Sequence, residues 1–374
     1  MRHKLIVAGL LAAVCMLADD SQRILTIDHY VRVRSTAPTL SGQDAQIYVR
    51  EVVQARTVTR GGPAPDRVVL FVHGAGTPAE VAFDAAFQDY SWMAYLAAAG
   101  FDVFAMDMTG YGRSTRPAAM SDPCNLARAQ QNAFIPQLIS APCNATSGSG
   151  LTTIASDWND IDGVVNHLRA LRRVDRLNLV GWSQGAPRAG GYTLQHPDKV
   201  LKLTLLAPAY NRTGPSDPPQ RNPGERAVMN TQSHDEFLAN WDRQTGCPDQ
   251  YDKAATAAVW AKMLESDSVG ATWGTGVRRA PVVPTWGWNQ SSVAKLQVPI
   301  LVIAGAEDKQ VLPERVKELY TDVGSPAKVF ATLACSSHNA IWERNHLLLF
   351  QASLDWLVRT SVKGVTAGMV KLGE

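Results

Sequence analysis

The chain has 374 residues and a formal net charge of +2 at pH 7, with 45% hydrophobic and 19% charged residues. This balance is typical of a globular protein with a large core, and it excludes an intrinsically disordered chain. Because the net charge is small and no run of Lys and Arg gathers on one face, we expect no nucleic-acid partner. The length suits one large α/β domain with insertions.

Residues 1–18 have the pattern of a secretory signal peptide. A basic start, Met1 to Lys4, precedes an almost wholly apolar stretch that runs from Leu5 to Ala18. We therefore expect a secreted or periplasmic protein whose mature form has no stable membrane span. The alternatives are a cytoplasmic protein with an uncleaved N-terminus, and a lipid anchor at Cys15.

Four cysteines follow this leader: Cys124, Cys143, Cys247 and Cys335. An even number suits an oxidising compartment. None of them forms a C-x-x-C pair, so we do not expect a zinc site. Cys124 and Cys143 bracket one segment and would close a local loop, which leaves Cys247 to pair with Cys335. Four free thiols are the alternative, because connectivity cannot be read from a sequence.

Strand-like and helix-like segments alternate along most of the chain, which predicts an α/β fold with a mainly parallel sheet. The first two strands alternate apolar and polar residues, as antiparallel edge strands do, whereas later runs are continuously apolar, as buried strands are. The predicted strands are 28–34, 45–53, 67–72, 101–106, 174–180, 200–207, 298–305 and 328–333. The predicted helices are 90–99, 151–172, 186–195, 252–265, 313–320 and 346–359.

Two stretches interrupt this alternation. Residues 115–150 contain four prolines and the sequence Ser-Gly-Ser-Gly, and we expect them to form a mobile surface loop. Residues 208–296 are rich in Pro and Gly and carry five tryptophans, which predicts an inserted lid or cap. The predicted α/β core then consists of residues 20–207 and 297–362.

The sequence Gly181-Trp182-Ser183-Gln184-Gly185 places a serine between two glycines, after a predicted strand and before a predicted helix. This is the placement of a nucleophile elbow, in which the serine is strained and the glycines leave room for close packing. The helix N-terminus favours developing negative charge, so the Gln184 N–H is a candidate oxyanion donor. A plain tight turn is the alternative. We expect Trp182 to pack beside the elbow.

A serine hydroxyl needs a base within reach and a third group that orients the base. Asp308 follows the predicted strand that ends at Gly305, and His338 follows the strand that ends at Leu333. Open α/β sheets place catalytic groups at such strand ends. Glu307 is the alternative acid, and a loop histidine bonded to backbone is the alternative reading of His338.

On these motifs, residues 65–360 resemble the α/β-hydrolase superfamily. The order Ser183, Asp308, His338 matches its order of nucleophile, acid and base. The stretches 73–76 (HGAG) and 107–114 match its loops after the third and fourth strands. The resemblance implies a mostly parallel eight-stranded sheet flanked by helices, with a lid inserted after the sixth strand. It also implies a second oxyanion donor, the Ala75 N–H, and a structural role for His73.

The predicted function is that of a serine hydrolase cleaving a carboxylic ester through an acyl-enzyme intermediate. Amide, lactone or carbon–carbon bond hydrolysis on the same triad is the alternative, and a non-catalytic binding protein is a remote one. The lid tryptophans favour a small-molecule ester with an apolar or aromatic face, unless they only pack the lid. No H-E-x-x-H, P-loop or G-x-G-x-x-G motif is present in the required context, so we expect neither metal nor organic cofactor.

Overall fold

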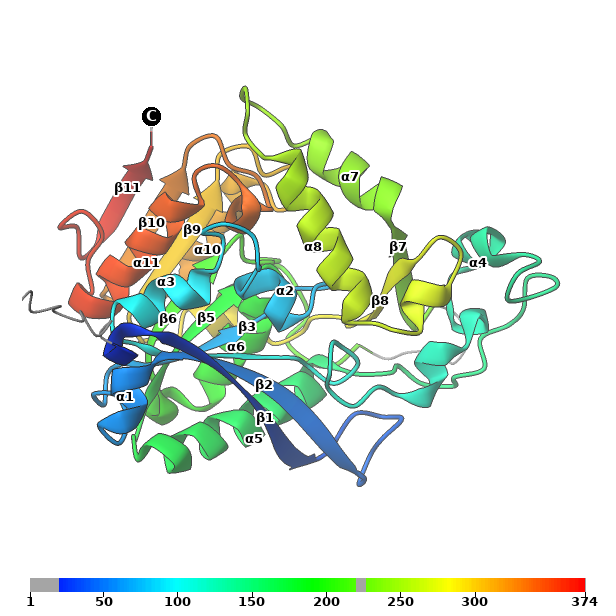
Figure 1. Cartoon of the computed structure of the whole chain (residues 1–374), viewed down its shortest axis with the longest axis horizontal. Helices are drawn as coiled ribbons and strands as arrows, with labels where there is room; N and C mark the ends of the chain where they lie inside the picture. The colour runs from blue at the N-terminus through cyan, green and yellow to red at the C-terminus, as the bar shows by residue number, and fades with distance from the viewer. Residues whose placement is uncertain (1–19, 220–226, 374) are drawn as a thin grey trace, which may run out of the picture.

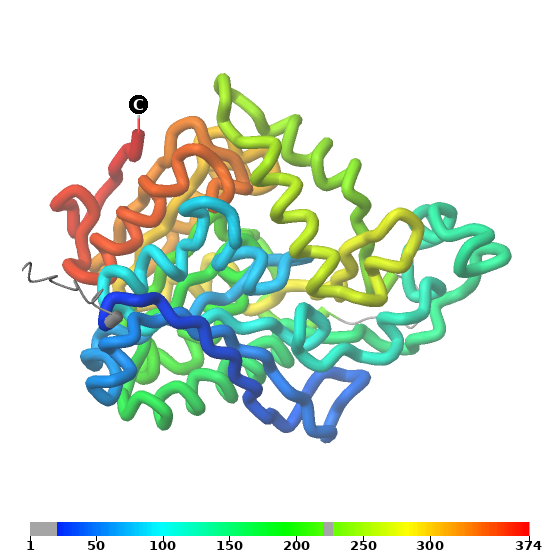
Figure 2. Tube along the Cα trace, viewed as in Figure 1, coloured from blue at the N-terminus to red at the C-terminus, as the bar shows by residue number. Residues whose placement is uncertain are grey.

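The computed structural model describes residues 20–219 and 227–373 (Figures 1 and 2). Their main sheet contains β1 (Ile24–Arg34), β2 (Asp44–Gln54), β3 (Val68–Val72), β4 (Asp102–Met106), β5 (Leu177–Trp182), β6 (Val200–Leu206), β9 (Ile300–Gly305), β10 (Lys328–Leu333) and β11 (Gly368–Leu372). The strand order is β1-β2-β4-β3-β5-β6-β9-β10-β11. The β1–β2 and β2–β4 pairs are antiparallel, and the other neighbours are parallel.

The expected α/β class is confirmed, and each of the eight predicted strands is present. The expected number of strands in the main sheet is wrong, because the described residues place nine strands in it. The additional strand is β11, which lies beside β10 at the edge of the sheet. Only Leu372 of this strand is fully buried. An edge strand of five residues with one wet face lacks the continuous apolar run that marks the central strands. The sheet therefore extends beyond residue 362.

The α-helices of the described residues are α1 (Ala55–Thr59), α2 (Ala79–Phe83), α3 (Trp92–Ala98), α4 (Arg128–Gln131), α5 (Ile154–Arg172), α6 (Gly185–Gln195), α7 (His234–Asp242), α8 (Lys253–Glu265), α9 (Gln290–Val293), α10 (Pro313–Asp322) and α11 (His346–Arg359). Single turns of 3₁₀-helix lie at Asp20–Gln22, Ala118–Ser121, Pro123–Asn125, Asn132–Phe134, Pro197–Lys199, Gly270–Thr272 and Ala340–Trp342. A separate antiparallel pair consists of β7 (Met229–Ser233) and β8 (Val277–Pro281).

Two apolar layers enclose the sheet because side chains alternate between the faces of each strand. Val69 and Phe71 of β3 belong to the cluster formed with α3 and α11, whereas Leu70 and Val72 belong to the cluster formed with α5, α6 and α10. Figure 1 shows α3 beside α11 and the long α5 on the other side of the sheet. Full burial of each such side chain stabilises the fold by about 1.5–3 kcal/mol.

We call residues 208–296, the predicted lid, the insertion. It lies between β6 and β9 in the chain and contributes the β7–β8 pair, α7, α8 and α9. Phe237, Trp241 and Trp260 of α7 and α8 join the apolar cluster that includes α3 and α11. The insertion is therefore packed into the same core layer as the helices of the main sheet.

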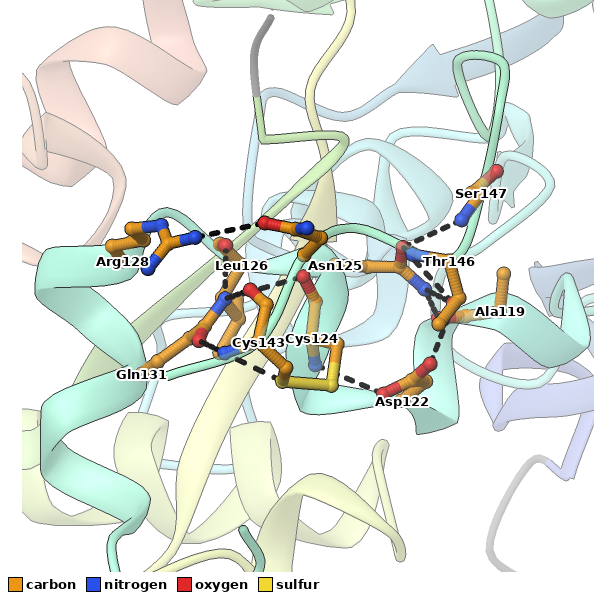
Figure 3. The surroundings of a disulfide bond; sticks show 11 residues. Ala119, Asp122, Cys124, Asn125, Leu126, Arg128, Gln131, Cys143, Thr146 and Ser147 are labelled. Carbon is orange, nitrogen blue, oxygen red and sulfur yellow. Dashed lines mark hydrogen bonds between the residues drawn. A yellow bond between two sulfur atoms is a disulfide. The ribbon is translucent and has the colours of Figure 1, made fainter. Parts of the chain in front are cut away.

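Residues 115–150 are held together by the disulfide between Cys124 and Cys143 (Figure 3). The Gln131 amide lies beside this bond, donates to the Cys124 and Cys143 carbonyls and accepts the Cys143 backbone N–H. Phe134 packs edge-on against Trp273 of the insertion at 5.4 Å. The predicted surface loop, residues 115–150, is thus anchored by a local disulfide and packs against the insertion.

The second disulfide, Cys247–Cys335, spans 88 residues and joins the insertion to the loop after β10. Both pairings are those predicted from the spacing of the cysteines. Two disulfides favour an oxidising compartment. No helix within residues 20–219 and 227–373 is long and apolar enough to cross a bilayer. The predicted signal peptide, residues 1–18, lies outside the described residues.

Candidate active site

Ser183 lies at the sharp turn between β5 and α6. Its φ of 56° falls in the left-handed region, which residues other than glycine rarely adopt. The Ser183 N–H donates to the Leu206 carbonyl at 2.9 Å, and its carbonyl accepts the N–H groups of Ala186 and Ala209 at 3.0 Å. Strained backbone of this kind persists only where the surroundings enforce it, and it is frequent at active sites.

Glycines allow the backbone around Ser183 to pack closely. A Cβ on Gly181 would lie 2.6 Å from the Gly185 carbonyl oxygen, and a Cβ on Gly185 would lie 2.2 Å from the Val72 carbonyl oxygen. On the loop after β3, a Cβ on Gly74 would lie 3.0 Å from Ser183 Cβ. Three segments therefore converge on one serine because these positions have no side chain.

Asp308 and His338 lie side by side in the loops after β9 and β10, and both side chains are buried. His338 Nδ1 is 2.9 Å from Asp308 Oδ2. Asp308 Oδ1 accepts the backbone N–H groups of Gln310 and Val311 at 2.8 and 2.7 Å. Because an ionised carboxylate can only accept, this hydrogen bond needs the proton on His338 Nδ1, and a neutral imidazole of that tautomer has its lone pair on Nε2.

Glu307, the alternative acid, has its carboxylate beside Gly246 of the insertion. A Cβ on Gly246 of the insertion would lie 2.0 Å from Glu307 Oε2, so the carboxylate lies against that backbone. The Glu307 N–H donates to the Ser336 carbonyl at 2.8 Å. Of the two adjacent acids, the structure brings Asp308 to His338.

Ser183 and His338 line the same narrow cavity, which has a volume of about 20 Å³. A broader cleft of about 640 Å³ adjoins it. The two spaces share four lining residues, namely Ala75, Asn240, Arg278 and Gln310. The cleft therefore leads to the serine. Among the described residues, no three His, Cys, Asp or Glu side chains are grouped as metal ligands.

Ala75 and Gln184 flank Ser183 as the two predicted oxyanion donors. Ala75 is exposed and lines the narrow cavity, while Gln184 is the N-cap residue of the 11-residue helix α6. Neither backbone N–H has an acceptor within the part of the chain that the structure describes. Unpaired N–H groups beside a helix N-terminus are suited to bind an oxyanion.

His73 supports the loop that carries Ala75. Its Nε2 accepts the Met108 N–H at 3.1 Å, so the proton is on Nδ1, which donates to the Gly74 carbonyl at 2.6 Å. Burial, together with the nearby charge of Arg188, lowers the pKa of His73 well below its ordinary value. His73 is therefore a neutral structural residue, in agreement with the role that the resemblance implies.

Arg188, which is fully buried on α6, contacts the same loop through its guanidinium. Its Nε donates to Asp157 of α5 at 2.7 Å, and its Nη1 donates to the carbonyls of His73 and Gly74 at 3.0 and 3.1 Å. Burial and the Asp157 charge act in opposite directions on the pKa of Arg188, and the net effect is a rise. The ion pair thus fixes the direction of two carbonyls next to Ala75.

A buried network around Glu343 joins the insertion to the loop that carries His338. Glu343 accepts hydrogen bonds from the Ser337 N–H and hydroxyl, from Trp241 Nε1 at 2.8 Å and from the Gln250 amide at 3.2 Å. Burial raises the pKa of Glu343, and the four donors oppose that rise. Ser337 precedes His338, so this network positions the histidine through its neighbour.

Trp182 and Gln244 add two further contacts to the His338 loop. Trp182 Nε1 donates to the His338 carbonyl at 3.0 Å, and its ring meets Trp342 edge-on at 5.4 Å. Gln244 Oε1 of the insertion accepts the N–H groups of Lys309 and His338 at 3.2 and 3.4 Å. Trp182 is therefore a packing residue beside the elbow, as the sequence predicts.

The tryptophans of the insertion mostly pack it against the rest of the protein. Four of them are buried, and Trp286 stacks edge-on against Trp158 at 4.8 Å. None of the five lines the narrow cavity or the adjoining cleft. The alternative reading of these residues, that they only pack the lid, fits the structure.

Four residues of the site were not identified from the sequence: Arg188, Gln244, Arg278 and Glu343. Several of their contacts join segments far apart in the sequence: Trp241 and Glu343 are 102 residues apart, and Arg188 and His73 are 115 residues apart. No local pattern marks such residues. A charged residue inside a small, apolar helix, as Arg188 is in α6, is the one available signal.

A family model described as the alpha/beta hydrolase fold matches residues 67–345. A serine hydrolase involved in carbazole degradation, the CarC enzyme, has a similar structure, with a TM-score of 0.52, 15% identity and coverage of 89% of this chain and 99% of its own. A thermophilic esterase from Thermogutta terrifontis is also similar, with a TM-score of 0.52, 16% identity and coverage of 88% of this chain and 98% of its own. At these identities the likeness shows the fold. A search of curated proteins finds no match to the sequence.

Proposed function

The chain belongs to the alpha/beta hydrolase family, and from that premise we propose that it is a serine hydrolase that cleaves a small-molecule carboxylic ester. One observation carries the proposal: Ser183 and His338 line one cavity, and Asp308 bonds the imidazole nitrogen on the far side of the ring. This placement supports the roles of nucleophile for Ser183, base for His338 and orienting acid for Asp308, which acyl transfer needs.

In the proposed mechanism, His338 Nε2 takes the Ser183 proton while Oγ attacks the ester carbonyl. Asp308 keeps the proton on Nδ1 and stabilises the imidazolium that forms. The N–H groups of Ala75 and Gln184 hold the oxyanion of the tetrahedral intermediate. The imidazolium then gives its proton to the leaving alcohol. A water molecule, deprotonated by His338, hydrolyses the acyl-enzyme and restores Ser183.

The aromatic walls of the narrow cavity support an apolar group next to the scissile bond. Trp182, Phe237 and Trp342 line it together with Ser183. Phe237 comes from the insertion, so we assign the insertion the role of a lid that completes the site. An ester is favoured over an amide because an alkoxide or phenoxide leaves with less help from a general acid.

We place this activity outside the cytoplasm, in the secreted or periplasmic protein that the leader predicts. The two disulfides support an oxidising compartment.

Labelling with a fluorophosphonate tests the proposal, because the reagent phosphonylates an activated serine. We expect the wild type to be labelled at Ser183, and the Ser183→Ala variant to be neither labelled nor active. Ser149→Ala, on an exposed loop, is the matched control and should label like the wild type. Labelling that persists in Ser183→Ala, or a wild type that does not label, would contradict the assignment. A panel of ester, amide, lactone and β-diketone substrates then defines the bond that is cleaved.

A further inference from the structure

Two adjacent arginines on β8 have opposite surroundings. Arg279 is buried and forms two hydrogen bonds with Asp267, from Nε at 2.8 Å and from Nη2 at 2.6 Å. Arg278, on the other face of the strand, has no carboxylate within 4.0 Å among residues 20–219 and 227–373. One guanidinium is therefore neutralised within the fold, and the other is not.

Arg278 is held at the narrow cavity. Its Nη1 donates to Thr77 Oγ1 at 3.0 Å, and its Cζ lies 5.8 Å from the centre of the Phe237 ring. A Cβ on Gly76, which has a φ of +77°, would lie 2.8 Å from Cζ, so this glycine leaves space for the guanidinium. Within the described residues, the bond to Thr77 uses one of five N–H donors. The other donors remain available to a ligand.

The position of Arg278 relative to the nucleophile makes this surplus charge relevant to the reaction. It lines the narrow cavity with Ser183 and His338, and it also lines the adjoining cleft. Among the residues that the structure describes, the other charged side chains of the cleft are those of Arg243 and Glu236, so this lining carries a net positive charge. Partial burial lowers the pKa of Arg278 to about 10, which leaves it charged at neutral pH but poorly solvated. An anion at this place would restore the lost solvation.

We propose that Arg278 binds a carboxylate of the substrate, so that the preferred ester carries one free acid group close to the scissile bond. This inference rests on the proposed ester hydrolysis, to which it adds a substrate class. A guanidinium pairs with a carboxylate through two parallel hydrogen bonds, which fixes orientation as well as affinity. One unpaired cation balances one negative charge, which favours a carboxylate over a phosphate dianion.

Matched esters test the proposal on the acyl side and on the leaving-group side. Mono-4-nitrophenyl adipate is compared with 4-nitrophenyl hexanoate, and 3-acetoxybenzoate with 3-acetoxybenzamide. We expect the wild type to prefer the acid in at least one pair by roughly 10- to 100-fold in kcat/KM, mainly through KM. Arg278→Gln should abolish that preference, so that the kcat/KM values of the acid and of its neutral partner become about equal. Arg278→Lys should retain part of it.

Thr77→Val is the matched control, because it removes the hydrogen bond of Arg278 but not the charge. A purely structural role of Arg278 would lower the turnover of both esters of a pair equally, in Arg278→Gln as in Thr77→Val. That result, or an acid preference that survives in Arg278→Gln, would overturn the inference while ester hydrolysis itself stands.

Binding to the Ser183→Ala protein separates the inference from the proposed function, because it needs no turnover. We expect hexanoate to bind more tightly than hexanamide or inorganic phosphate, and the additional Arg278→Gln change to remove the difference. If hexanoate binds in this way but the wild type hydrolyses no ester, the proposed function is refuted and the carboxylate site is supported. Equal binding of all three probes, or tighter binding of phosphate, would overturn the site.

Discussion

The strand-end loops of the core and the insertion form two walls of one cavity by different means. Ser183, Asp308 and His338 follow three parallel strands, β5, β9 and β10, whose ends lie at one edge of the sheet. The insertion contributes Phe237 and Asn240 from α7, and Arg278 from β8. Strand β8 pairs with β7 in a small sheet that is separate from the main one. In the proposed function, the core supplies the reactive groups, and the insertion supplies side chains that a substrate would meet.

The two walls are held in place by different kinds of contact. The elbow is fixed by backbone hydrogen bonds to the neighbouring strand and by glycines against backbone. The insertion is fixed to the core by side chains: the Cys247–Cys335 disulfide, the Glu343 network and Gln244. Variation of the insertion can therefore change the substrate without changing the elbow.

The largest expected effect is a loss of kcat when Asp308, on the core side of the cavity, is changed. Asp308→Asn should lower kcat by about 10⁴-fold, because the amide stabilises the wrong tautomer of His338. Glu307→Gln is the control and should change kcat by less than about twofold, since Glu307 lies against Gly246 instead of His338. Steady-state kinetics on one ester measures both variants. Equal, small losses in the two would refute the role assigned to Asp308.

The next largest effect is on the free energy of unfolding when a disulfide is removed. One disulfide holds the insertion and the other holds the 115–150 segment, so their removal compares these two segments. Replacing Cys247 and Cys335 by Ser opens a loop of 88 residues and should cost about 4–5 kcal/mol in the free energy of unfolding, against about 3 kcal/mol for Cys124 and Cys143, which are separated by 19 residues. Denaturant unfolding measures both. Activity should fall further in the first variant, because Cys335 is in the loop of His338. A greater loss of activity from the local disulfide would reverse the comparison.

The last expected effect is a pH dependence within the core, which develops gradually over several pH units. Asp160 on α5 accepts the Thr109 N–H at 3.1 Å, and burial, reinforced by Asp157, raises its pKa to about 7. The folded state therefore holds this proton more tightly than the unfolded chain, whose Asp pKa is about 3.9. The stabilising contribution is complete below about pH 4 and is lost as the pH rises through about 7.

Asp160→Asn should remove this dependence and keep an acceptor for Thr109. Relative to the wild type, the variant should gain stability between pH 4 and 8, by roughly 4 kcal/mol at most. Urea unfolding at each pH measures the difference. A stability difference that does not change with pH would show that Asp160 is ionised in the folded state throughout.

Much of the core could be predicted because its signals are local. A continuous apolar run such as 67–72 marks a buried strand wherever it occurs, and a serine between two glycines after a strand marks the elbow. The order of acid and histidine after later strands then follows from the parallel sheet, which brings strand ends together. β11 was missed because an edge strand with one buried end residue has a weak apolar pattern.

The insertion was harder to predict because its apolar residues have no regular period. Five tryptophans suggested a substrate face, yet they are used for packing, since a large aromatic side chain stabilises a core as well as it binds a ligand. Arg278 and Arg279 look alike in the sequence. Only the position of Asp267 distinguishes the paired arginine from the unpaired one.

The sequence by itself determined the α/β class, the elbow at Ser183, the order of Asp308 and His338, and the pairing of the cysteines once one local loop was assumed. These features depend on residue type, periodicity and order along the chain. The tertiary structure decided which of two adjacent acids reaches His338, which arginine faces the cavity, and that Arg188 and Glu343 hold the two loops beside Ser183. Those outcomes depend on contacts between separate segments of the chain, such as Arg188 with the His73 carbonyl and Trp241 with Glu343, where direction and burial, and not residue type, set the interaction.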